Sequence, residues 1–152
     1  MLIGHGLLIG YAELGSERVV RGRRLLCSQR GRRSGCGRTF SLRIASVIAG
    51  FTVRTGTLSR LLLAVVGGSC IKAAWEHHVS SGLTLGSGYR LWRRLVLAQS
   101  HLRSALCRLG PPPSCAHSQP LAQLASHLQQ TLGSTACLFA AFQLTLQRPL
   151  FG

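Results

Sequence analysis

The chain has 152 residues, and 46% of them are hydrophobic, which suits one domain or a small module followed by a helical one and excludes disorder throughout. Its formal net charge of +15 predicts a polyanionic partner, such as nucleic acid, an anionic membrane surface or an acidic protein. With only Glu13, Glu17 and Glu76 as acids, carboxylate-bound metal centres, Ser-His-Asp triads and glycosidase carboxylate pairs are excluded.

The first predicted region, residues 1–43, contains short apolar pieces separated by glycines, and about half of the arginines. Short apolar pieces separated by glycines favour short strands over a long helix. Residues 44–109 are predicted to be helical. Gly67 and Gly68 end a first apolar helix, and Ser69 is a candidate N-cap for the next one.

A third helix is predicted after a connector at residues 83–88. Its apolar side chains recur at three- and four-residue steps, namely Leu91, Leu95, Ala98, Leu102, Ala105 or Leu106, and Leu109. Residues 110–120 form a Pro-rich linker, and residues 121–152 form a C-terminal helical segment. The third helix is therefore amphipathic, with an apolar side and a basic side.

The opening residues have no basic flank before their apolar part, and Glu13 follows closely, so we expect no secretory signal peptide. Arg54 and Arg60 interrupt the apolar stretch at residues 44–66, so we expect no membrane span and no membrane partner. Scattered cysteines without a signal peptide favour a reducing compartment. These features predict a cytoplasmic protein.

The three central helices have the proportions of a helix-turn-helix unit, in which the third helix enters the major groove of DNA. Tyr89, Arg90, Arg93 and Arg94 near its start are the candidate DNA-binding residues. Arginine suits this position because its planar fork bonds guanine or phosphate through two hydrogen bonds. The alternative is a solvated basic face on an ordinary helical bundle.

The segment LLCSQRGRRSGCGRTFSL combines two cysteines with an arginine-rich loop. Cys27 and Cys36 are the candidate metal ligands, but tetrahedral zinc needs four ligands, and this pair supplies two. Four arginines in and after the loop are candidates for gripping phosphates, namely Arg30, Arg32, Arg33 and Arg38. The segment is thus half of a metal site, a nucleic-acid-binding arm, or an arginine-rich loop with two incidental thiols.

Cys36, Arg38 and Phe40 form a Cys-x-Arg-x-Phe ending, and SCIKAAWEHHVSSGLTLGSGYRLWRRL follows in the helical region. Residues 1 to about 109 thereby resemble the zinc-ribbon plus helix-turn-helix front end of insertion-sequence transposases and related uncharacterised bacterial proteins. The resemblance implies DNA binding, with zinc as a possible cofactor. The first Cys-x2-Cys knuckle of that family is missing, so residues 1–43 would be a degenerate zinc-ribbon-like module.

We therefore predict a mainly α protein, with a helix-turn-helix-like helical body and a small arginine-rich, β-containing N-terminal module. The predicted function is binding of double-stranded DNA without catalysis, since no nucleophile motif supports an enzyme. One alternative is a helical module for self-association as a homo-oligomer or for protein interaction. Another is a decayed or mispredicted mobile-element fragment without activity, since abundant Arg without Asn or Asp also arises from GC-rich coding sequence.

Overall fold

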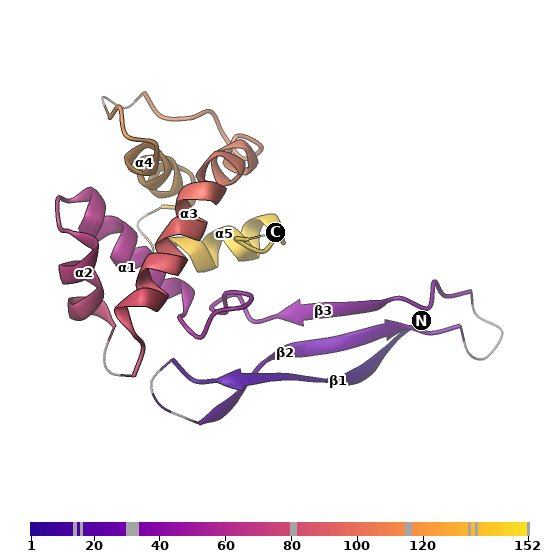
Figure 1. Ribbon diagram of the computed structural model, residues 1–152. Helices are drawn as coiled ribbons and strands as arrows, with labels where there is room; N and C mark the ends of the chain where they lie inside the picture. Colours follow the sequence, from indigo (N-terminus) through magenta and orange to yellow (C-terminus); the bar gives the residue numbers. More distant parts are fainter. Residues whose placement is uncertain are drawn as a thin grey trace.

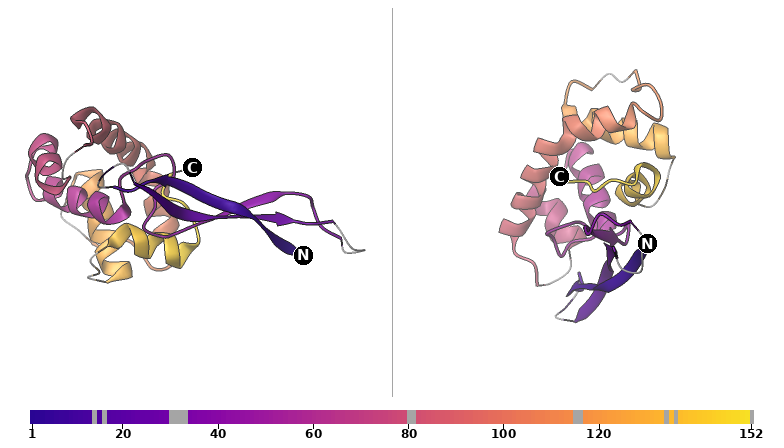
Figure 2. Two further views of the ribbon diagram at one scale, coloured as in Figure 1. Left: turned by 90° about the horizontal axis from the view of Figure 1, so that it is seen from below. Right: turned by 90° about the vertical axis from the view of Figure 1, so that its right-hand side faces the viewer.

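A computed structural model describes residues 1–13, 15, 17–29, 34–79, 82–114, 117–133, 135 and 137–151. Within these residues the chain forms a three-stranded antiparallel sheet and five helices. The sheet is a long arm that projects from a body made of the helices (Figure 1, Figure 2). The predicted mainly α class is therefore wrong, and the fold is mixed, with a substantial sheet beside the helices.

The arm consists of β1 (Leu2–Tyr11), β2 (Arg18–Cys27) and β3 (Thr39–Arg43), with β2 in the centre. The glycines that predicted short strand pieces lie inside two ten-residue strands. They accompany irregularities in the β1–β2 register, between Gly4 and Leu7 and between Leu8 and Ile9. Gly6 has a φ of +116°, which suits a glycine at a bulge. Because bulges let the strands continue past their glycines, the strands are longer than the short pieces that the sequence predicts.

The body contains α1 (Thr55–Val66), α2 (Ile71–His78), α3 (Leu85–Leu106), α4 (Pro120–Leu132) and α5 (Leu138–Leu146). α1 packs against α2, α4 and α5, while α3 packs against α2 and α4. Their apolar stripes share one core, which includes the fully buried Leu61, Leu95 and Phe139. Among the described helices, none has the length and apolarity needed to cross a bilayer.

Two helix starts differ from the predicted ones. Cys70 rather than Ser69 caps α2, since its Sγ accepts a hydrogen bond of 3.4 Å from the N–H of Ala73. α3 begins three residues before Gly88, inside the predicted connector. A Cβ at Gly88 would lie 2.6 Å from Cδ2 of Trp75, so the absence of a side chain lets this part of α3 pack onto the indole. Tertiary packing therefore extends the helix through residues with weak helix propensity.

A segment after β3, residues 44–54, joins the arm to the body. Arg21 of β2 donates from Nη2 to the carbonyl oxygens of Ile48, at 3.3 Å, and Phe51. Oε1 of Glu13, just beyond β1, accepts a hydrogen bond of 2.9 Å from the N–H of Arg54. Hydrogen bonds from both long strands of the arm thus fix this segment.

We expect acid to destabilise the fold through His78 at the end of α2. Burial, and then the charges of His77 and Arg60, lower the pKa of His78 below its ordinary value of 6.5. The unfolded chain therefore binds this proton more readily, so stability is complete above about pH 6.5 and falls as the pH drops toward the folded-state pKa. Thermal unfolding between pH 7.5 and 5.5 checks this, and the His78→Gln variant should lose less stability than the parent over that interval.

Candidate nucleic-acid interface

The helix α3 carries arginines on one side and core residues on the other. Arg90, Arg93 and Arg94 are all exposed and, at spacings of three and four residues, lie on one face. Leu91 and Leu95 on the opposite face have no exposed surface. Burial of the apolar stripe therefore fixes the rotation of α3 and turns its three arginines outward.

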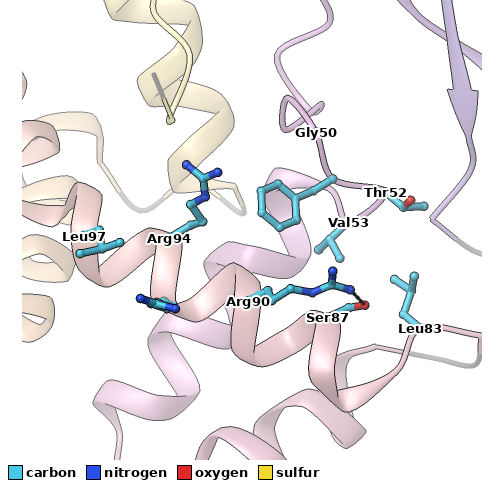
Figure 3. A pocket seen from close by; sticks show the side chains of 10 residues that line it. Gly50, Thr52, Val53, Leu83, Ser87, Arg90, Arg94 and Leu97 are labelled. Atoms are coloured by element: carbon cyan, nitrogen blue, oxygen red, sulfur yellow. Dashed lines mark hydrogen bonds between the residues drawn. The ribbon is translucent and has the colours of Figure 1, made fainter.

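These arginines line a pocket of about 520 Å³ between α3 and the segment that joins the arm to the body. Figure 3 shows Arg90 and Arg94 extending from α3 on the side where Gly50 and Thr52 lie. We call this pocket the arginine groove; it is lined by Gly50, Phe51, Thr52, Val53, Leu83, Ser87, Arg90, Arg93, Arg94 and Leu97. Its walls thus come from two segments that are distant in sequence.

A second hollow of about 290 Å³ continues the arginine groove along α3, because Arg94 and Leu97 line both. Phe151 lines this second hollow, and Phe51 lines the arginine groove. The two rings pack edge to face, with their centroids 5.8 Å apart. The two hollows therefore form one band of arginine, aliphatic and aromatic side chains along α3.

The second hollow also includes His101, one helical turn beyond Leu97. Nη2 of Arg148, near the C-terminal end, donates a 3.0 Å hydrogen bond to Nε2 of His101. Since an arginine side chain can only donate, Nε2 of His101 is the acceptor. Arg148 thereby adds a fourth guanidinium at the end of the band.

The arginine groove is strongly electropositive, since none of its described lining residues is acidic. Between the lining side chains that the structure describes, Nη2 of Arg90 donates a weak 3.4 Å hydrogen bond to Oγ of Ser87. In the whole chain three acidic residues face 18 basic ones, so at most three of the basic charges can be paired one to one. A phosphate group would supply the missing negative charge and accept several N–H bonds.

Further positive charge lies behind the wall of the groove. Burial lowers the pKa of the Arg21 guanidinium, and the charges of Arg54 and Arg43 lower it further. Arg21 is bonded to the carbonyl oxygen of Phe51, so this cluster adjoins the groove. Its field adds to the attraction for a polyanion.

The structure brings only part of the predicted DNA-binding set together. Arg90, Arg93 and Arg94 share the arginine groove, whereas Tyr89 is 49% exposed and does not line it. Arg38 lies just before β3, at the end of the arm away from the helices (Figure 1). The remaining predicted phosphate contacts lie outside the described residues, namely Arg30, Arg32 and Arg33.

The predicted metal ligands lie close together at the same end of the arm. The N–H of Cys36 donates a 3.4 Å hydrogen bond to Sγ of Cys27. Hydrogen bonds from the backbone and then the side chain of Cys36 lower the pKa of Cys27. Among the described residues no group of three or more His, Cys, Asp or Glu side chains gathers. The pair supplies two of the four ligands that a tetrahedral zinc site needs, and zinc binding stays a prediction.

No local pattern in the sequence indicates that Phe51, Phe151 and Arg148 contribute to this band. Phe51 lies in a segment without regular secondary structure, and Phe151 is 100 residues further along the chain. Arg148 meets His101 across 47 positions. Only the packing of the C-terminal residues beside α3 creates these contacts.

No protein-family model, curated protein or solved structure matches the chain significantly. The resemblance to the front end of transposases therefore stays a prediction drawn from the Cys36, Arg38 and Phe40 ending and the helical segment.

Proposed function

We propose that this protein binds double-stranded DNA through the arginine face of α3 and catalyses no reaction. The observation that carries the proposal is the convergence of Arg90, Arg93 and Arg94 on one groove whose described lining contains no acid. Exposed guanidinium groups at helical spacing can follow successive phosphates or reach base edges. The related role of a transposase-like front end is part of this proposal.

Within this function the arm and the body have different tasks. The arginine groove holds the backbone of the duplex, and the rest of the +15 charge attracts the polyanion from a distance. Arg38 near Cys36 at the far end of the arm lies apart from the groove and would meet a separate stretch of phosphates. Zinc, if the two cysteines bind it with further ligands, would stabilise that end of the arm.

Replacing Arg90, Arg93 and Arg94 by alanine tests the proposal. Each lost charge-assisted hydrogen-bonding group is worth at least about 1 kcal/mol, so we expect at least about 100-fold weaker binding of a duplex. Fluorescence anisotropy of a short labelled DNA duplex measures this affinity.

A second triple variant, with Arg60, Lys72 and Arg108 changed to alanine, removes the same charge from exposed sites outside the groove. We expect it to lose much less affinity. Equal losses in both variants would mean that only net charge matters, and would reject the groove as the binding site.

The alternative of self-association through amphipathic helices has less support, because the apolar stripes of the helices are buried in one core. Leu91, Leu102 and Leu128 have no exposed surface. Self-association therefore needs another surface. The hypothesis of a mispredicted or decayed fragment is tested by detecting the protein in cells by mass spectrometry.

A further inference from the structure

One face of the β arm is apolar and exposed. Direct cross-strand partners share a face, and faces alternate along a strand except at a bulge, where the strand without the extra residue carries the assignment. Leu7, Arg23 and Leu42 therefore share one face; β2 extends it to Leu25 and its partner Phe40, and β1 extends it to Ile9 and Tyr11. All the large hydrophobic side chains of the strands that are exposed lie on the same face. We call it the apolar sheet face: Leu2, Leu7, Ile9, Tyr11, Val20, Phe40 and Leu42, with the half-buried Leu25 between them.

The other face of the sheet contacts the joining segment at residues 44–54. It carries Arg21, whose guanidinium bonds the joining segment, and Gly10, where a Cβ would lie 2.6 Å from Cδ of Arg21. The aliphatic side chains there, such as Ile3 and Leu8, are only partly exposed. The seven exposed side chains of the apolar sheet face are 45–58% exposed, and those nearest the body, Tyr11 and Leu42, line hollows together with Thr52 and Leu144.

The size of this surface suits a protein interface. A large side chain presents on the order of 200 Å² when fully free. The seven exposed side chains are 45–58% exposed, so together they present roughly 700 Å². A stable interface of standard size buries about 800 Å² on each partner, which this face approaches once the adjoining arginine stems are added.

We propose that a second copy of this chain covers the apolar sheet face, so that two arms pack face to face in a dimer. A two-fold axis makes one apolar surface serve as both halves of the contact. Two such sheets pack about 10 Å apart and interdigitate their side chains. The joining segment is bonded to the other face of each arm through Arg21, so this segment stays outside the contact.

The charged residues on the face give the dimer a recognisable salt dependence. Arg18 and Arg23 share this face, and the guanidinium of Arg18 lies 6.0 Å from the ring centroid of Tyr11. Their stems cover apolar surface while their charged ends reach the rim. Each chain also carries +15, so salt strengthens the dimer by screening repulsion, whereas it weakens DNA binding. This inference does not rest on the proposed function.

Sedimentation equilibrium of the whole chain without DNA, at about 0.1 M and about 0.5 M NaCl, tests the proposal. We expect a dimer whose dissociation constant falls at the higher salt concentration. The double variant Leu7→Thr with Leu42→Thr should raise that constant at least about 100-fold, because threonine keeps strand propensity but removes apolar surface. The matched variant Leu63→Gln with Leu109→Gln changes exposed leucines outside the arm and should dimerise like the parent.

Hydrogen exchange of the unaltered protein gives a second measurement if the strand variant fails to fold. Amides of β1 and β3 should become better protected as protein concentration rises. A monomer at both salt concentrations would overturn the proposal, as would a dimer that the strand variant and the matched variant weaken equally. A chain that dimerises only after DNA is added, or that instead uses this face for an acidic amphipathic peptide, would also overturn it.

Discussion

Raising NaCl from about 50 mM to about 200 mM should weaken binding of the protein to duplex DNA about 1000-fold. Each neutralised phosphate contributes about −0.9 to the slope of log affinity against log salt, so roughly six contacts give a slope near −5. Six contacts engage a third of the 18 basic residues, a fraction that the groove arginines and their neighbours can supply. Fluorescence anisotropy across a salt series measures this slope.

The same salt series shows which residues contribute to the slope of log affinity against log salt. If Arg90, Arg93 and Arg94 each contact a phosphate, the variant with alanine at all three sites should have a slope smaller by about 2.7. The matched variant, altered at Arg60 and Lys72 and also at Arg108, should keep the parental slope. A parental slope shallower than about −1 would contradict the whole binding mode, because a chain of this charge would then be contacting almost no phosphates.

The position of the arginines on α3 was predictable because helical amphipathicity is a local property. Leu91, Leu95 and Leu102 repeat at helical spacing, and burial of that stripe alone decides which way the neighbouring arginines point. Trp75 on the preceding helix lies in the same core, at 3% exposure. The helical periodicity of the sequence therefore predicted the helices of the body and the arginine side of the candidate site.

The arm was harder to predict because strand pairing is not local. Gly4 and Gly10 interrupt the apolar alternation of β1, yet both pair with β2 within one long ribbon. Exposed Leu7 and Ile9 would normally indicate the buried face of a sheet, and nothing in the described chain covers them. A second copy would explain why such a pattern persists on an exposed surface.

The wall of the arginine groove opposite α3 is formed by tertiary contacts, which the spacing of residues in the sequence does not predict. Phe51 and Phe151 meet only because the C-terminal residues return to α3. In contrast, Cys27 and Cys36 are close in sequence and also lie close in space, because Cys27 ends β2 and Cys36 lies three residues before β3, which pairs with β2. Arg38 belongs to that distant end of the arm, so sequence order alone could not show that it lies apart from Arg90.

Replacing Trp75 by alanine should destabilise the protein by about 3–5 kcal/mol, the usual cost of truncating a buried tryptophan. The indole is 3% exposed, and it lies so close to Gly88 that even a methyl group there would be only 2.6 Å from Cδ2. Removing it leaves a cavity between α2 and the first turn of α3 that the backbone at Gly88 cannot fill. Urea unfolding measures the loss, which for a domain of this size corresponds to roughly 10 °C or more in Tm.

Trp92 provides the matched control, because it is only partly buried beside the same core. Trp92→Ala should cost clearly less than Trp75→Ala, while Trp75→Phe should recover part of the lost stability by refilling the cavity. Arg90 lies two residues after Gly88, so the loosened start of α3 should also weaken DNA binding in Trp75→Ala at temperatures where it is still folded. If Trp75→Ala and Trp92→Ala were equally stable, the indole would not be the anchor of α3, and the position of the arginine groove would need another explanation.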